Sequence, residues 1–129
     1  MAITNPVGWF EIYVDDLERA RAFYEGVFQV KLDPLESPGK IMPGIEMLMF
    51  PGDMEQYGST GAIAKMDGVA AGGNSTMVYF SCEDCAVEAG RIEQHGGQLV
   101  QGKFSIGEHG FIAVAVDTEG NTIGLHSMA

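Results

Sequence analysis

Two strand-to-helix units in this chain share one pattern at a constant spacing. In the first, the aromatic and β-branched run Trp9–Val14 predicts a strand, and Asp15 or Asp16 then caps a helix. In the second, Thr76–Ser81 predicts a strand and the acidic pair Glu83 and Asp84 caps the next helix. Each position of the second unit lies 68 residues after its counterpart in the first, without a gap. The simplest explanation is an internal duplication, which limits the fold to two similar modules.

The first predicted helix has one apolar face. Its apolar residues recur at steps of three and four positions, which is the spacing of one side of a helix; they are Leu17, Ala20, Phe23, Tyr24, Val27 and Phe28. We therefore expect this helix to pack on a sheet. The second helix is predicted to continue to His95, where Gly96 and Gly97 form a helix stop. A cation at this end suits the helix dipole, so we interpret His95 as structural.

Further strands are predicted after each helix. In the first half, prolines and glycines at positions 34, 38, 39, 43 and 44 break the chain into a short strand and a loop. The strands expected next are Ile45–Phe50, Gly61–Met66, Leu99–Lys103, Phe111–Asp117 and Thr122–Ser127, with an irregular segment at Gly52–Thr60, a glycine-rich linker at Asp67–Asn74 and a hairpin turn at Asp117–Asn121. The two halves, about 7–66 and 75–128, therefore share the order βαβββ.

Composition fits one domain and argues against two classes of partner. The chain has 129 residues, 46 % of them hydrophobic, which is enough for one core, so we expect a single domain over residues 1–129. Seven basic residues against 18 acidic ones give a formal charge of −11, which repels nucleic acid and anionic membranes. No run approaches the roughly 20 apolar residues of a membrane span, and no signal segment is visible. We therefore expect a cytoplasmic protein.

The two cysteines, Cys82 and Cys85, have CxxC spacing. A zinc site would need a second ligand pair elsewhere in the chain, and the sequence contains none. A thioredoxin-like redox motif would need the strand-to-helix context of a different fold. We therefore expect two free thiols.

Residues in both halves resemble a known superfamily. The run Trp9–Ala20 followed by Phe23–Glu25 is similar to the opening signature of glyoxalase/bleomycin resistance/dioxygenase proteins, the vicinal-oxygen-chelate superfamily. Tyr79–Asp84, His95–Gly97 and Asp117–Asn121 are similar to its second module. The resemblance implies an α+β fold in which two tandem βαβββ modules form curved mixed sheets around a pocket. It selects no activity, because the superfamily includes isomerases, lyases, ring-cleaving dioxygenases and metal-free antibiotic-binding proteins.

The resemblance also indicates where a metal would be bound. In metal-using relatives, the ligands stand on the first and last strands of each module and converge on one divalent ion. Local matching places these positions at Trp9, Ala62, Met77 and Gly124. None of these residues supplies a nitrogen or oxygen donor suited to such an ion. We therefore expect no metal and no other cofactor.

One hypothesis is an enzyme that works by proton transfer. Residues two apart on a strand share a face. If the ligand positions face the pocket, as the resemblance implies, then Glu11, Tyr79 and His126 face it too. In this hypothesis Glu11 is the base, His126 is the acid or an orienting group, and Tyr79 donates a hydrogen bond. The structural alternative is a Glu–His hydrogen bond that only satisfies two half-buried side chains.

The rival hypothesis is a protein that sequesters a small aromatic or cationic compound. Trp9, Tyr13 and Tyr79 would then stack on the ligand while Glu11 supplies charge. Met77 would form part of the pocket wall, and His109, in a glycine-flanked loop, would lie at the pocket mouth. A metal-dependent lyase or dioxygenase with displaced ligands and a non-catalytic accessory domain remain further alternatives.

Two partners follow from these hypotheses. The first is a small molecule, which the sequence does not identify. The second is another copy of the chain, because each open curved sheet has exposed edges and apolar surface that a symmetric interface would cover. We therefore expect a homodimer.

Overall fold

The computed structural model describes residues 5–35 and 44–129. The first module contains β1 (Trp9–Tyr13), α1 (Leu17–Phe28), β2 (Asp33–Pro34), β3 (Ile45–Met49) and β4 (Thr60–Met66). The second contains β5 (Tyr79–Ser81), α3 (Cys85–Ala89), the 3₁₀ turn η1 (Glu93–His95), β6 (Gln98–Ser105), the 3₁₀ turn η2 (Gly107–His109), β7 (Phe111–Val116) and β8 (Thr122–Ser127). The predicted order βαβββ is therefore confirmed in both modules. The part of the predicted loop at positions 38, 39 and 43 lies outside the described residues.

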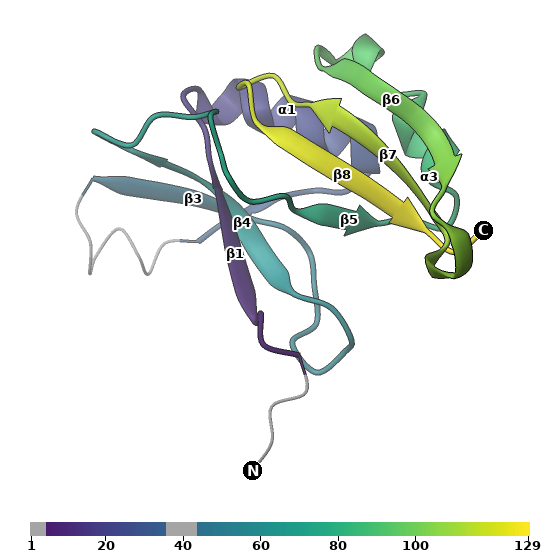
Figure 1. The fold of residues 1–129 in the computed structure, drawn as a ribbon. Helices are drawn as coiled ribbons and strands as arrows, with labels where there is room; N and C mark the ends of the chain where they lie inside the picture. Colours follow the sequence, from purple (N-terminus) through teal and green to yellow (C-terminus); the bar gives the residue numbers. More distant parts are fainter. Residues whose placement is uncertain (1–4, 36–43) are drawn as a thin grey trace.

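Each module forms one four-stranded mixed sheet, as expected for the α+β class (Figure 1). The strand orders are β1-β4-β3-β2 and β5-β8-β7-β6, so the first strand of each module pairs in parallel with its last strand. The pairing is equivalent in the two sheets, because Glu11 lies opposite Ala62 and Tyr79, 68 residues after Glu11, lies opposite Gly124. This equivalence supports the duplication and leaves β1 and β5 as edge strands.

Both helices begin where the sequence predicts. The Asp16 side chain accepts a hydrogen bond from the Arg19 N–H, and the Asp84 side chain accepts one from the Ala86 N–H. These caps satisfy backbone donors that a helix N-terminus leaves free. The matching caps are a further sign of the repeat.

The second helix differs from its prediction. We expected one helix as far as His95, but α3 ends at Ala89 and a separate 3₁₀ turn contains His95. Gly90, a poor helix former, stands at the break. The Gly97 N–H then bonds the carbonyl of the buried Ile92, which turns the chain toward β6.

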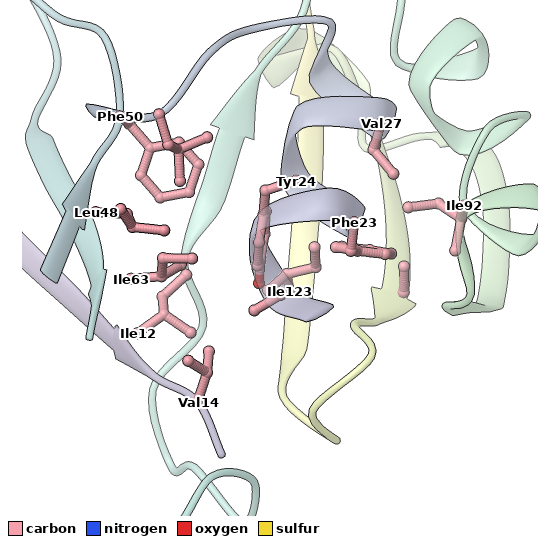
Figure 2. Close-up of a cluster of buried hydrophobic side chains, with 13 residues drawn as sticks. Ile12, Val14, Phe23, Tyr24, Val27, Leu48, Phe50, Ile63, Ile92 and Ile123 are labelled. Atoms are coloured by element: carbon pink, nitrogen blue, oxygen red, sulfur yellow. The ribbon is translucent and has the colours of Figure 1, made fainter. Parts of the chain in front are cut away.

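Helix α1 lies between the two sheets and joins their cores (Figure 2). Phe23 and Tyr24 are fully buried on this helix. They belong to one apolar cluster with Ile63 of the first sheet and Ile123 of the second. Because one cluster contains residues of both sheets, the two modules share a core. Burial of apolar side chains in such a core is the main term that stabilises a small protein.

The β7–β8 turn connects the two modules through polar contacts. The buried Glu119 carboxylate accepts hydrogen bonds from the backbone N–H groups of Asp15 and Asp16 and from the Arg19 guanidinium, at 2.6 to 3.0 Å. Burial acts to raise the pKa of Glu119, but the hydrogen bonds from Arg19, the Asp16 N–H and the Thr118 hydroxyl outweigh it and hold the pKa at about 2. Glu119 is therefore ionised and binds the start of α1.

A second part of the same turn reaches the core. The Tyr24 hydroxyl donates to the Asp117 carboxylate at 2.6 Å. The Asn121 amide donates to the same carboxylate and to the carbonyl of Tyr13 at the end of β1. The segment predicted as a simple hairpin turn therefore also holds the first module in place. We call Asp117, Glu119 and Asn121 the intermodule turn.

Candidate functional site

Three side chains of β1 form a hydrogen-bonded row on one face of the first sheet. The Glu11 carboxylate accepts from the Trp9 indole Nε1–H at 3.0 Å and from the Tyr13 hydroxyl at 2.8 Å. Trp9 and Tyr13 pack against buried apolar residues of β3 and β4, whereas the alternate β1 residues Phe10 and Ile12 belong to the core cluster with α1. The predicted common face of Trp9, Glu11 and Tyr13 is confirmed.

The charge of Glu11 affects its neighbour. The hydrogen bond to Glu11, together with burial and the negative charge of that carboxylate, raises the pKa of the Tyr13 hydroxyl. Tyr13 therefore keeps its proton at neutral pH and remains a donor. With a donor on each oxygen, the carboxylate is held in one orientation, as a charged group in a binding site must be.

Two cavities lie along the seam between β1 and residues 74–81. The larger, of about 760 Å³, is bounded by Trp9, by the loop Pro51–Ser59 and by Met77 and Tyr79. The smaller, of about 390 Å³, is lined by Glu11, Tyr13, linker residues and the start of β8. Phe10, Thr76 and Val78 contribute to both cavities.

Five of the seven candidate residues therefore lie along one seam. Trp9, Met77 and Tyr79 line the larger cavity, and Glu11 and Tyr13 line the smaller one. Whether they act on a ligand remains a prediction. Their arrangement offers a fixed carboxylate next to aromatic surfaces, which suits an aromatic or positively charged molecule.

The two remaining candidates, His126 and His109, lie apart from these cavities. His126 Nε2 is 2.7 Å from the His109 carbonyl oxygen, and the His109 side chain is 78 % exposed. Neither residue lines either cavity. The sequence suggested His126, Tyr79 or a ligand as the partner of Glu11; in the structure the hydrogen bonds to its carboxylate come instead from Trp9 and Tyr13 on its own strand.

Comparison with solved structures addresses the fold. A glyoxalase I variant from Zea mays aligns over 97 % of this chain with a TM-score of 0.72 and 21 % identity. A glyoxalase family protein from Bacillus cereus aligns over 98 % of this chain and 95 % of its own, with a TM-score of 0.69 and 18 % identity. The chain has the glyoxalase-like fold. This confirms, for the fold, the resemblance to the vicinal-oxygen-chelate superfamily.

The sequence comparisons are more limited in extent. The model of the bleomycin resistance protein-like N-terminal family matches residues 7–29, which carry β1 and α1. A search of curated proteins gave no significant match. This glyoxalase-like chain spans about half the length of the maize glyoxalase I chain, 47 % of it. A glyoxalase/bleomycin resistance protein/dioxygenase family enzyme from Burkholderia phytofirmans, by contrast, is covered over 98 % of its length, at 17 % identity and a TM-score of 0.65.

The metal site that the glyoxalase-like fold implies does not fit the residues present. Its four positions carry Trp9, Ala62, Met77 and Gly124, which offer no hard donor. The space beside Gly124 is also taken, because a Cβ atom added there would overlap the ring of Tyr79. Within residues 5–35 and 44–129, no group of three or more His, Cys, Asp or Glu side chains is arranged to hold a metal ion.

The cysteines do not form a reactive pair. Both are free, and Cys85 is fully buried. Burial, with a smaller contribution from Glu88, raises the pKa of the Cys82 thiol to about 12. A thiol that stays protonated at neutral pH is a poor nucleophile, so this CxxC segment lacks the activated thiolate of a redox site.

The sequence interpretation missed two parts of the seam. The linker contributes Val69, Ala70 and Asn74 and is fastened by hydrogen bonds from the N–H groups of Ala71 and Gly72 to the side chains of Asp15 and Asn121. The irregular loop Pro51–Ser59 forms a wall of the larger cavity. Neither segment has strand or helix periodicity, and their polar and glycine-rich composition is equally typical of a plain connection.

One finding bears on membranes. Among the described helices, none combines the length and the apolar character that crossing a bilayer requires.

Proposed function

We propose that this chain binds a small aromatic molecule, with a preference for cations, in the seam between its modules and without a metal ion. The observation that carries the proposal is the Glu11 carboxylate, which lines the smaller cavity and is held by the Tyr13 hydroxyl and by the indole N–H of Trp9, a residue of the larger cavity. A fixed negative charge next to aromatic faces attracts a cation both by its charge and by the ring quadrupoles.

Three further features support a binding role. Both cavities have volumes in the range of small-molecule sites, roughly 300 to 1,000 Å³. The net charge of −11 makes the surroundings attractive to cations and unattractive to anions. The match of residues 7–29 to a bleomycin resistance protein-like family agrees with a binding role for β1.

Binding is favoured over proton-transfer catalysis by the hydrogen bonds around the proposed acid and base. Both Glu11 oxygens already accept hydrogen bonds, and the His126 ring is engaged with the His109 carbonyl. An acid–base mechanism would need both groups within reach of one substrate. We therefore place sequestration first.

A matched pair of probes tests the proposal. Trp9 is the only tryptophan of the chain and lines the larger cavity, so its fluorescence reports a molecule bound there. We expect saturable quenching by the permanent cation 10-methylacridinium. Acridine, which has nearly the same shape and is uncharged in mildly alkaline buffer, should bind about tenfold more weakly, because it lacks the charge attraction.

The same titration tests the metal. Protein purified without an affinity tag and dialysed against a chelator should bind 10-methylacridinium as tightly as untreated protein, since the metal positions carry no donors. Elemental analysis should find less than one Zn, Ni, Fe or Mn per chain. Lack of Trp9 quenching by either probe would contradict the proposed function, and one tightly bound ion per chain would contradict metal independence.

We also propose that the chain forms a homodimer. Edge strands and partly exposed apolar side chains, such as Val100 and Phe104 on the edge strand β6, favour a symmetric partner. Sedimentation velocity at micromolar concentration should give twice the mass of one chain, 13.8 kDa. A monomer at that concentration would show that the expectation is wrong.

A further inference from the structure

We infer that Tyr57 is a further ligand-contacting residue, carried over the larger cavity by the loop Pro51–Ser59. The inference rests on the proposed function, because it requires a molecule bound beside Trp9. It adds a specific aromatic contact that neither the sequence pattern nor the fold comparison indicates.

The loop supplies one wall of the larger cavity. Pro51, Gly52, Asp53 and Gln56–Ser59 of the loop all line it, together with residues Thr76–Ser81. Trp9 and Phe10 of β1 contribute to the same space. A ring carried by this loop can therefore meet a molecule that also touches Trp9.

The ring of Tyr57 has few contacts in the protein. Tyr57 is 92 % exposed, although its residue borders a cavity with several aromatic side chains. Leaving an aromatic ring in water forgoes the gain of burying it, whereas stacking on a planar ligand would recover that gain. Tyrosine also loses little rotamer freedom on binding, which suits it to contact a ligand.

The backbone on either side of Tyr57 gives the loop a defined shape. The Asp53 carboxylate accepts from the Glu55 N–H, and the Asp53 carbonyl accepts from the Gln56 N–H, which forms a turn before Tyr57. Gly58, directly after it, has a φ of 109°, which L-residues rarely adopt. The turn and the glycine shape the loop, and the hydrogen bonds within it do not involve the Tyr57 side chain.

The test compares two variants of this loop by Trp9 quenching with 10-methylacridinium. We expect Tyr57→Ala to raise the dissociation constant about three- to tenfold, the size of one aromatic contact. Tyr57→Phe should bind like the unmodified protein because it keeps the ring. Met54→Ala is the matched control, since Met54 is 78 % exposed on the same loop but does not line the cavity.

The outcomes separate this inference from the proposed function. If the unmodified protein binds the probe and Tyr57→Ala binds equally well, the role of Tyr57 is overturned and the proposed function stands. If Tyr57→Phe weakens binding as much as Tyr57→Ala, ring stacking is overturned. Absence of any binding by the unmodified protein overturns both. Because Tyr57 is exposed, its substitution should leave the unfolding transition unchanged, and circular dichroism checks this.

Discussion

Glu11→Gln is expected to weaken the binding of 10-methylacridinium about tenfold or more while changing the free energy of unfolding by less than about 1 kcal/mol. Glutamine keeps the volume of the side chain and removes its charge. Its amide oxygen can still accept from the Trp9 indole, and its NH₂ group can donate to the Tyr13 hydroxyl oxygen, so the row on β1 remains bonded. Charge recognition is then lost without a loss of structure.

Glu46→Gln is the control for this substitution. Glu46 is an exposed carboxylate on β3 of the same sheet, and it lines neither cavity. It should therefore leave the affinity unchanged. A Glu11→Gln variant that binds the cation as tightly as the unmodified protein would show that Glu11 is an ordinary satisfied strand residue. If a substrate is found and turnover falls while binding persists, the proton-transfer hypothesis would be favoured instead.

Glu119→Ala should lower the free energy of unfolding by about 2 kcal/mol, because it removes the buried, charged acceptor of several hydrogen bonds. The variant loses the hydrogen bonds to the N–H groups of Asp15 and Asp16 and to the Arg19 guanidinium. Urea unfolding followed by circular dichroism measures the change. Glu108→Ala, at a glutamate whose side chain is 88 % exposed, should change stability by less than about 0.5 kcal/mol. Equal effects of the two substitutions would contradict the role given to the intermodule turn.

The contribution of Glu119 also depends on pH. Its pKa is about 2 in the folded protein and 4.5 in an ordinary glutamate, so ionised Glu119 favours the folded state. This stabilisation is fully present above about pH 5 and is lost as the pH falls from there toward about 2. The difference in stability between the unmodified protein and Glu119→Gln should therefore shrink over this range. A difference that stays constant would contradict the lowered pKa.

Much of the fold could be predicted from the sequence because the repeat, the strand alternation and the helix caps are local signals. A cap was expected at Asp15 or Asp16 and at the pair Glu83 and Asp84, and Asp16 and Asp84 are the capping residues. The break at Gly90 was missed, because helix propensity gives only a weak signal at a single glycine and the packing of Ile92 decides where the chain turns. The contacts of Glu119 were missed because they join residues about 100 positions apart.

The candidate site was predicted only in part, because only the pattern within a single strand is a local signal. Strand alternation gives the face of Trp9, Glu11 and Tyr13 correctly, since that depends on one strand. Strand alternation gives no information on whether residues of different sheets meet. The hydrogen bond between Glu11 and His126 that the sequence suggested is not formed, because His126 contacts the His109 carbonyl instead. The loop Pro51–Ser59, which carries Tyr57, has neither strand nor helix periodicity in its sequence. Only the folded structure shows that it lines the larger cavity.

The ring of Tyr79 above Gly124 has a consequence for how this chain can change over generations. A single mutation that placed a donor at position 124 would push its side chain into that ring, and the other three positions would still carry no ligand. A single mutation that removed the ring would open space without creating a ligand. A metal ligand at position 124 would therefore require at least two coordinated changes, one that supplies the donor and one that moves or removes the Tyr79 ring.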